Sequence, residues 1–215
     1  NDNTQILVDK VAQKTSTFYL GSTQITEFDP TGNEGLNVIE VRLTDPVTTC
    51  SNTDSKTIRV KALPTIQFSL PASVCSNGGV VAMNATPIGG TYTGGPLLQD
   101  GKSFNPSDLQ IGISTTYTYS YTDAQNCSNT SNASVVVNDS TTVTVQLPGG
   151  KTMLCENGNP ETLSTNVTGG TFTVDGVSAT NVFTPNLPGN YAVVFKYTNG
   201  DQCQSSAKLT ITVNA

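Results

Sequence analysis

Apolar and β-branched residues recur along the chain in short runs, and three pairs of runs follow one plan. In each pair, an alternating apolar run leads into a polar turn that carries a cysteine, and a second run follows. The pairs are Val38–Leu43 with Lys56–Val60, Tyr117–Thr122 with Ala133–Val137, and Tyr191–Tyr197 with Ala207–Val213. Alternation at a period of two, bounded by Asp, Asn, Gly and Ser, predicts a strand, a turn and a second strand.

The three turn cysteines are regularly spaced. Their positions differ by 127 − 50 = 77 and by 203 − 127 = 76, and each cysteine lies at the same distance before a strand valine. The residues concerned are Cys50, Cys127 and Cys203, with Val60, Val137 and Val213. A repeat of this length is too long for a solenoid unit and fits one small all-β domain, so we expect an array of separate cores.

Further markers extend the repeat beyond the turns. A Phe-x-Pro motif recurs at Phe28, Phe104 and Phe183. Cys75 and Cys155 precede the aromatic residues Tyr92 and Phe172 by the same interval, since 92 − 75 = 17 and 172 − 155 = 17. The same interval counted back from Phe18, the matching aromatic of the first repeat, gives Asn1 instead of a cysteine. We therefore predict a partial first repeat at 1–62 that lacks its first strand, and whole repeats at 63–139 and 140–215.

Within these repeats, the apolar runs predict further short strands. They fall at Ile6–Val11, Thr17–Leu20, Thr65–Leu70, Val80–Ala85 and Thr142–Leu147. No stretch of twelve residues has a 3.6-residue period, so helix should be almost absent. About seven short strands per repeat, with cysteines near the second and penultimate strands, predict an all-β fold of tandem immunoglobulin-like sandwiches. The chain has no Trp, so Tyr92 and Phe172 are expected to take the place of the buried Trp of antibody domains.

Composition excludes several classes of partner. Charged residues make up 12% of the chain, the net charge is −6, and no apolar run is long enough to span a bilayer. The ten Lys and Arg are scattered singly, so nucleic acid and anionic lipid are not expected as partners, and neither is membrane insertion. Since the chain begins at Asn1 in mid-repeat, we interpret it as a piece of a longer polypeptide.

Five cysteines in a Thr-rich β protein of low charge indicate an oxidising compartment. We predict two disulfides inside single repeats, Cys75 with Cys127 and Cys155 with Cys203. Each would close a loop of about 50 residues and stabilise its repeat by roughly 4 kcal/mol. Cys50 would then be unpaired, because its partner was lost by truncation or replaced by Asn1, or because it is a reactive or intermolecular thiol.

A metal site is the alternative use of these cysteines, and the sequence disfavours it. No two cysteines lie closer than about 25 residues, and histidine is absent. Calcium at a repeat junction would require Asp139, Asp45 or Asp123, but no dense Asp-x-Asp run supports such a site. We therefore predict neither a metal nor another cofactor.

Catalysis is not expected either. Without histidine the chain has no Ser-His or Cys-His pair and lacks the usual general base near neutral pH. Asp100 with Asp123, or Glu156 with Glu161, could form carboxylate pairs, but each lies in a turn context where such residues usually cap the backbone. We therefore predict no catalytic residues.

Aromatic residues could instead form a sugar-binding platform. Most of them recur at the same place in every repeat, which favours a shared core, while Tyr19, Phe68, Tyr117 and Tyr191 stand outside this pattern.

N-glycosylation sequons, common by chance in such a chain, occur at Asn84, Asn129, Asn132 and Asn166.

Several motifs together resemble a known repeat type. They are Cys75-Ser-Asn77, Gly89-Gly-Thr-Tyr-Thr-Gly94, Phe104-Asn-Pro106, Tyr117-Thr-Tyr-Ser-Tyr-Thr-Asp123 and Cys127-Ser128. This combination is similar to the immunoglobulin-like, PKD-like repeats of very large Bacteroidota surface adhesins, including those of flavobacterial gliding motility. The resemblance covers 63–215 well and 1–62 in part.

The resemblance implies a tandem stalk on the bacterial outer surface, exported by type IX secretion. It also implies that Asp139-Ser140-Thr141 is an O-glycosylation motif, with Ser140 as the candidate site. From sequence, the chain is thus expected to be a structural segment of a cell-surface filament or adhesin. Its partners would be neighbouring repeats of the same long chain, and possible further partners are surface glycans or other copies of the filament. The alternatives are a carbohydrate- or surface-binding module and a spacer beside a secreted enzyme.

Overall fold

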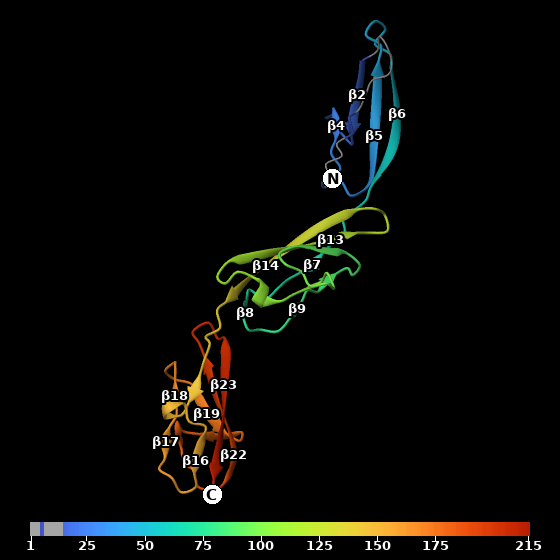
Figure 1. Ribbon diagram of the computed structural model, residues 1–215. Helices are drawn as coiled ribbons and strands as arrows, with labels where there is room; N and C mark the ends of the chain where they lie inside the picture. The colour runs from blue at the N-terminus through green and yellow to red at the C-terminus, as the bar shows by residue number, and fades with distance from the viewer. Residues whose placement is uncertain (1–4, 7–14) are drawn as a thin grey trace. The chain divides into compact units, whose positions relative to one another are not determined.

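The computed structural model describes residues 5, 6 and 15–215 (Figure 1). It divides into two compact units, one running up to residue 66 and including 120–130, and the other comprising 67–119 with 131–215. The repeat boundaries 1–62, 63–139 and 140–215 remain a prediction. The cysteine position at Asn1 and most of the predicted strand Ile6–Val11 lie outside the described residues.

The first unit contains one four-stranded antiparallel sheet with the strand order β3-β2-β5-β6, and a separate pair β1-β4. These strands are β1 (Gln5–Ile6), β2 (Thr15–Leu20), β3 (Thr23–Ile25), β4 (Glu27–Phe28), β5 (Gly35–Thr44) and β6 (Ser51–Val60). Alternation decides which side chains of β5 are covered: Ile39 is buried, whereas its neighbour Val38 is exposed. Phe28 of the repeated Phe-x-Pro motif is also buried.

The second sandwich comprises strands β7 to β14. One sheet has the order β11-β13-β14-β8, and the strand pairs β10-β7 and β12-β9 form the opposite layer. The bounds are β7 (Gln67–Phe68), β8 (Ser73–Cys75), β9 (Val81–Ala82), β10 (Ala85–Thr86), β11 (Thr91–Gly94), β12 (Ser103–Phe104), β13 (Ser114–Thr122) and β14 (Ser128–Asn138). A short 3-10 helix, Pro106–Asp108, follows β12. The core between the layers contains Met83, Phe104, Leu109, Tyr117, Val135 and Val137.

The third sandwich repeats this plan with strands β15 to β23. Its main sheet is β16-β23-β22-β19-β20, and the pairs β15-β18 and β17-β21 form the other layer. The bounds are β15 (Val145–Gln146), β16 (Met153–Cys155), β17 (Glu161–Thr162), β18 (Ser164–Thr165), β19 (Thr171–Val174), β20 (Val177–Ala179), β21 (Val182–Phe183), β22 (Gly189–Thr198) and β23 (Gln204–Asn214), with a 3-10 turn at Pro148–Gly150. Its separate core includes Leu147, Leu163, Phe183, Val193, Phe195 and Ile211.

The all-β class and the tandem sandwich architecture predicted from sequence are confirmed. If β9 and β10 count as one interrupted strand, the second sandwich has seven strands. In both complete sandwiches, the short strand that ends in the early cysteine lies parallel to the last long strand, β8 beside β14 and β16 beside β23. The other strand pairings with a recorded direction are antiparallel.

Repeated aromatic residues supply the cores. Phe104 and Phe183 are almost fully buried, as are the equivalent residues Tyr119 and Phe195. Tyr92 lies 4.7 Å from Tyr119, and Phe172 lies 4.8 Å from Phe195, measured between ring centroids. Two residues that sequence analysis considered for a sugar platform, Phe68 and Tyr117, also pack into the second core. Their burial assigns these aromatic residues to packing.

Candidate functional site

The turns that carry the three late cysteines share several features, although the turn of Cys50 is one residue longer than those of Cys127 and Cys203, whose own N–H groups bond to the Asx side chain. An Asp or Asn side chain accepts hydrogen bonds from backbone N–H groups two to four residues ahead, and the residue before the cysteine has a positive φ. The acceptors are Asp45, Asp123 and Asn199, and the positive-φ residues are Thr49 (58°), Asn126 (62°) and Gln202 (62°). In each turn the Asp or Asn also donates its backbone N–H to the carbonyl of the cysteine, at 2.9 to 3.1 Å.

The early cysteines are also held alike. Cys75 pairs with Asn138 and Cys155 with Asn214, each at the end of the parallel strand pair. The next residue donates its backbone N–H to the same asparagine, from Ser76 at 2.9 Å and from Glu156 at 2.7 Å. Each early cysteine therefore lies beside the last residue of the long final strand.

The structure joins Cys75 to Cys203, with a Cα–Cα distance of 5.5 Å and a sequence separation of 128. Cys203 is fully buried. Hydrogen bonds surround this link: Asn77 Nδ2 donates to the Gln204 carbonyl at 2.9 Å, and Asn199 Nδ2 donates to the Asp139 carbonyl at 2.8 Å. A covalent bond thus connects the end of the second sandwich to the turn of the third.

The predicted pairing of Cys75 with Cys127 is therefore wrong, and so is that of Cys155 with Cys203. Cys127 and Cys155 are free thiols. The physical reason is strand length: Cys127 directly precedes β14, whereas Cys75 lies beside the last residue of that strand. The eleven residues of β14 span roughly 36 Å at ~3.3 Å per residue, far more than a disulfide can bridge. The same separation holds along β23 in the third sandwich.

Cys50 is a free, exposed thiol, and Cys127 is free and half-buried. The turn around Cys127 lies against residues that precede the second sandwich. Lys61 Nζ donates to the Gln125 carbonyl at 2.8 Å, and Asn129 Nδ2 donates to the Pro64 carbonyl at 3.0 Å. The turn of Cys203 makes the same kind of contact with Asp139, so each turn meets the linker in front of its own sandwich.

The candidate modification sites differ in accessibility. Ser140 is half-buried, and its hydroxyl lies 2.9 Å from the Ser76 hydroxyl, which also accepts the Ser140 backbone N–H. Among the sequon residues, Asn84 and Asn132 are exposed, whereas Asn129 is half-buried. Asn166 is exposed, but its side chain donates to the Thr142 carbonyl. O-glycosylation at Ser140 would therefore have to displace a hydroxyl contact.

Three of the four candidate acidic residues, Asp100, Asp123 and Glu161, have local side-chain partners. Asp100 accepts hydrogen bonds from the Ser103 hydroxyl and from backbone N–H groups, and these bonds lower its pKa, with the hydroxyl bond as the largest cause. Asp123 caps its turn, and Glu161 pairs with Lys151 at 2.6 Å. In the described part of the chain, no three Cys, Asp or Glu side chains gather as ligands for a metal ion.

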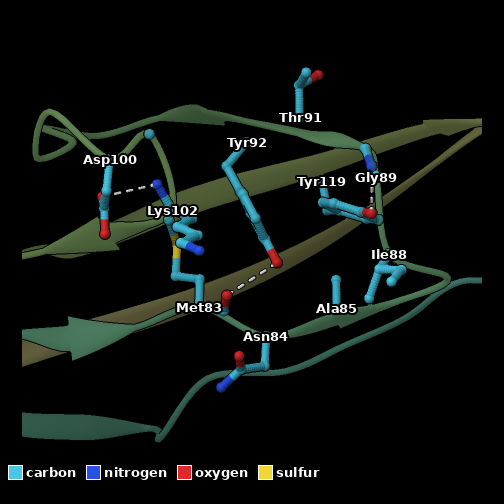
Figure 2. A pocket seen from close by; sticks show the side chains of 12 residues that line it. Met83, Asn84, Ala85, Ile88, Gly89, Thr91, Tyr92, Asp100, Lys102 and Tyr119 are labelled. Carbon is cyan, nitrogen blue, oxygen red and sulfur yellow. Dashed lines mark hydrogen bonds between the residues drawn. The ribbon is translucent and has the colours of Figure 1, made fainter.

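An open groove of about 560 Å³ lies on the second sandwich (Figure 2). Tyr92 crosses it from β11 and donates its hydroxyl to the Met83 carbonyl at 3.0 Å. The Tyr119 hydroxyl donates to the Pro87 carbonyl at 2.5 Å and accepts the Gly90 N–H at 2.7 Å. Burial, followed by the neighbouring Tyr119, raises the pKa of Tyr92. Both hydroxyls already have partners, and the Tyr92 phenol stays protonated at neutral pH, so Tyr92 does not supply a general base.

The rim of this groove is accessible. Ile88 lines it and is 85% exposed, and Asp100 and Lys102 come from the turn before β12. Sequence reasoning missed the groove, since it is made by the β10–β11 connection and that turn, which the repeat pattern does not bring together. Its chemistry is that of a shallow apolar surface with one carboxylate and one ammonium group.

Comparison with known proteins gives distant similarities, and no family model matches the chain. Hyalin of Lytechinus variegatus is 28% identical over 229 residues; the match covers 100% of this chain and 40% of hyalin. Fibronectin(III)-like modules of Clostridium thermocellum CbhA are 12% identical, with a TM-score of 0.33 and coverage of 69% of this chain and 95% of theirs. A 1.5-MDa bacterial ice-binding adhesin is 14% identical, with a TM-score of 0.30 and coverage of 98% and 90%. The chain spans less than half of hyalin, and these similarities do not define a family.

Among the described residues, no helix has the length and apolar character needed to cross a bilayer.

Proposed function

We propose that this chain is a structural repeat segment of an extracellular cell-surface filament or adhesin and acts as an extended stalk. The observation that carries the proposal is the Cys75–Cys203 bond, which joins two sandwiches that have separate cores. A disulfide is typical of proteins in oxidising, extracellular compartments. A covalent link that bypasses the linker transmits tension from one repeat to the next.

The construction of the main sheets agrees with a mechanical role. The final strands of both sandwiches are long, at eleven residues each, and pair along their length with a neighbouring strand. The motifs that resemble those of Bacteroidota adhesins support a bacterial surface location, type IX export and a role in gliding motility. Neighbouring repeats of the same long chain would be its main partners.

Single-molecule stretching of the whole chain from its two ends tests the stalk. With the disulfide intact, the segment from Cys75 to Cys203, whose ends are 128 positions apart in the sequence, cannot extend. We expect reduction to lengthen the fully stretched chain by roughly 460 Å, at ~3.6 Å per residue. An equal stretched length in oxidising and reducing buffer would show that the link carries no load.

A carbohydrate- or surface-binding module is the second candidate, favoured by the open groove at Ile88. A glycan array distinguishes the two functions. For a stalk, we expect no specific glycan binding by the intact chain. Specific binding that Ile88→Asp abolishes would favour the module, and Val80→Asp is the matched control, since Val80 is exposed but does not line the groove.

A further inference from the structure

The end of β6 is less covered than the end of the equivalent strand in the other two sandwiches. Its two apolar residues, Ile58 and Val60, are only half-buried. Their counterparts in β14 and β23, which follow the late cysteines at the same distances, are at most 2% exposed: Val135, Val137, Ile211 and Val213. Both complete sandwiches therefore have a cover at this place that the described part of the first unit does not supply.

A short parallel strand provides part of that cover in both complete sandwiches. β8 lies beside the end of β14, and β16 lies beside the end of β23. The middle residue of each short strand, Val74 or Leu154, packs against the core. Among the described strands of the first unit, β6 pairs with β5 on one side and ends the sheet order β3-β2-β5-β6. Such an edge presents backbone groups that can pair with a further strand.

The backbone of β6 has the register that a short parallel strand requires. The pair of Leu36 with Arg59 matches the pair of Asn190 with Thr212 in the third sandwich. The Thr212 N–H points away from β22 and donates to the Thr152 carbonyl, directly before β16, at 2.8 Å. Because bonded and non-bonded pairs alternate along an antiparallel ladder, the Arg59 N–H points away from β5 in the same way. It is thus the donor that an added strand would meet.

We infer that the end of β6 is an acceptor site for a short parallel strand with a central apolar side chain, which covers Ile58 and Val60 and accepts the Arg59 N–H. The repeat register aligns Asn1 with Cys75, so the counterpart of β8 ends at residue 1. In a longer polypeptide, the segment directly ahead of Asn1 is therefore the occupant of this site. The inference goes beyond the stalk and does not depend on the disulfide.

Extending the full chain at its N-terminus by a copy of residues 71–74 tests this site. In the register of β8 with β14, the copied valine lies opposite Val60. Compared with the unextended chain, the Arg59 amide should exchange about tenfold more slowly in NMR, as one added hydrogen bond would give. The same extension with Val74→Asp in the copy should give no protection, because a carboxylate is costly to bury against Ile58.

The Ser55 amide is the control within the same strand. Its N–H also points away from β5, since it bonds to the Asp54 side chain at 2.8 Å. It lies outside the three-residue register of the short strand, so its exchange rate should be the same in all three chains.

Three outcomes would overturn the inference. They are an unchanged exchange rate of the Arg59 amide in the extended chain, equal slowing with the Val74→Asp copy, or dimers of the unextended chain in which the Arg59 amide is already protected. The last outcome would assign the edge to a second copy. Circular dichroism checks that both extended chains fold. The stretching experiment depends on Cys75 and Cys203 alone, so failure of this inference is distinguishable from failure of the stalk.

Discussion

Replacing Cys75 by Ser is expected to lower the free energy of unfolding of the second and third sandwiches by about 4 kcal/mol each. Cys75 lies beside Asn138, and the turn of Cys203 contacts Asp139. When one sandwich is folded and the other is unfolded, the disulfide therefore ties the unfolded one into a closed loop of roughly 65 residues. The closed loop lowers the conformational entropy of that unfolded chain. In thermal unfolding, the melting temperature should fall by roughly 15 to 30 °C.

The free cysteines provide matched controls for this prediction. Cys203→Ser should match Cys75→Ser, whereas Cys127→Ser and Cys155→Ser should leave the melting temperature unchanged, because both residues are free thiols. If Cys127→Ser were as destabilising as Cys75→Ser, a disulfide within one repeat would be the stabilising bond instead.

Replacing Phe195 by Ala is expected to destabilise the third sandwich by about 3 to 5 kcal/mol. Its side chain is fully buried, contacts Phe172 and belongs to the core around Leu147 and Ile211. The core of the second sandwich contains none of these residues. The hydrogen-exchange protection of the second sandwich should therefore fall only slightly. Hydrogen exchange followed by mass spectrometry of the peptides measures both regions at once.

Leu187→Ala is the control in the same sandwich, since Leu187 is 63% exposed and its truncation should change stability by less than about 0.5 kcal/mol. Equal loss of protection around Phe104 and around Phe195 in Phe195→Ala would contradict separate cores. The chain would then unfold as one cooperative structure.

The hairpins were predictable from the sequence because alternation and turn chemistry act locally. The runs Tyr117–Thr122 and Ala133–Val137 fall within β13 and β14, and Tyr191–Tyr197 falls within β22. The predicted run Val80–Ala85 is interrupted between β9 and β10, where the Met83 N–H bonds to the Lys102 carbonyl instead of a neighbouring strand. A partner supplied from a distant turn leaves no pattern in the run itself.

The disulfide pairing was not predictable from spacing, since regular intervals fit bonds within repeats and bonds between repeats equally well. The deciding fact is the parallel pairing of β8 with β14, which places Cys75 a full strand length away from Cys127. Parallel neighbours depend on long-range packing, and a three-residue strand has no periodic signal of its own. The length of the final strand, which separates Cys127 from the residue beside Cys75, would have excluded a bond between these two cysteines.

The extra strand β20 had a local signal that was also missed. Asp175 and Gly176 both have positive φ, 49° and 82°, and form the two-residue turn between β19 and β20. Asp-Gly between two β runs is a strong hairpin signal. The second sandwich has Gly94 and Gly95 near this point, and Cβ atoms added to them would clash with residues of β13. The repeat comparison therefore predicted no additional strand here.

Peptide mapping of the unreduced protein tests the covalent junction most directly. After free thiols are alkylated and the chain is digested without reductant, the account predicts one linked peptide pair joining Cys75 to Cys203, with alkylated Cys50, Cys127 and Cys155. Linked pairs joining Cys75 to Cys127 and Cys155 to Cys203 would contradict it.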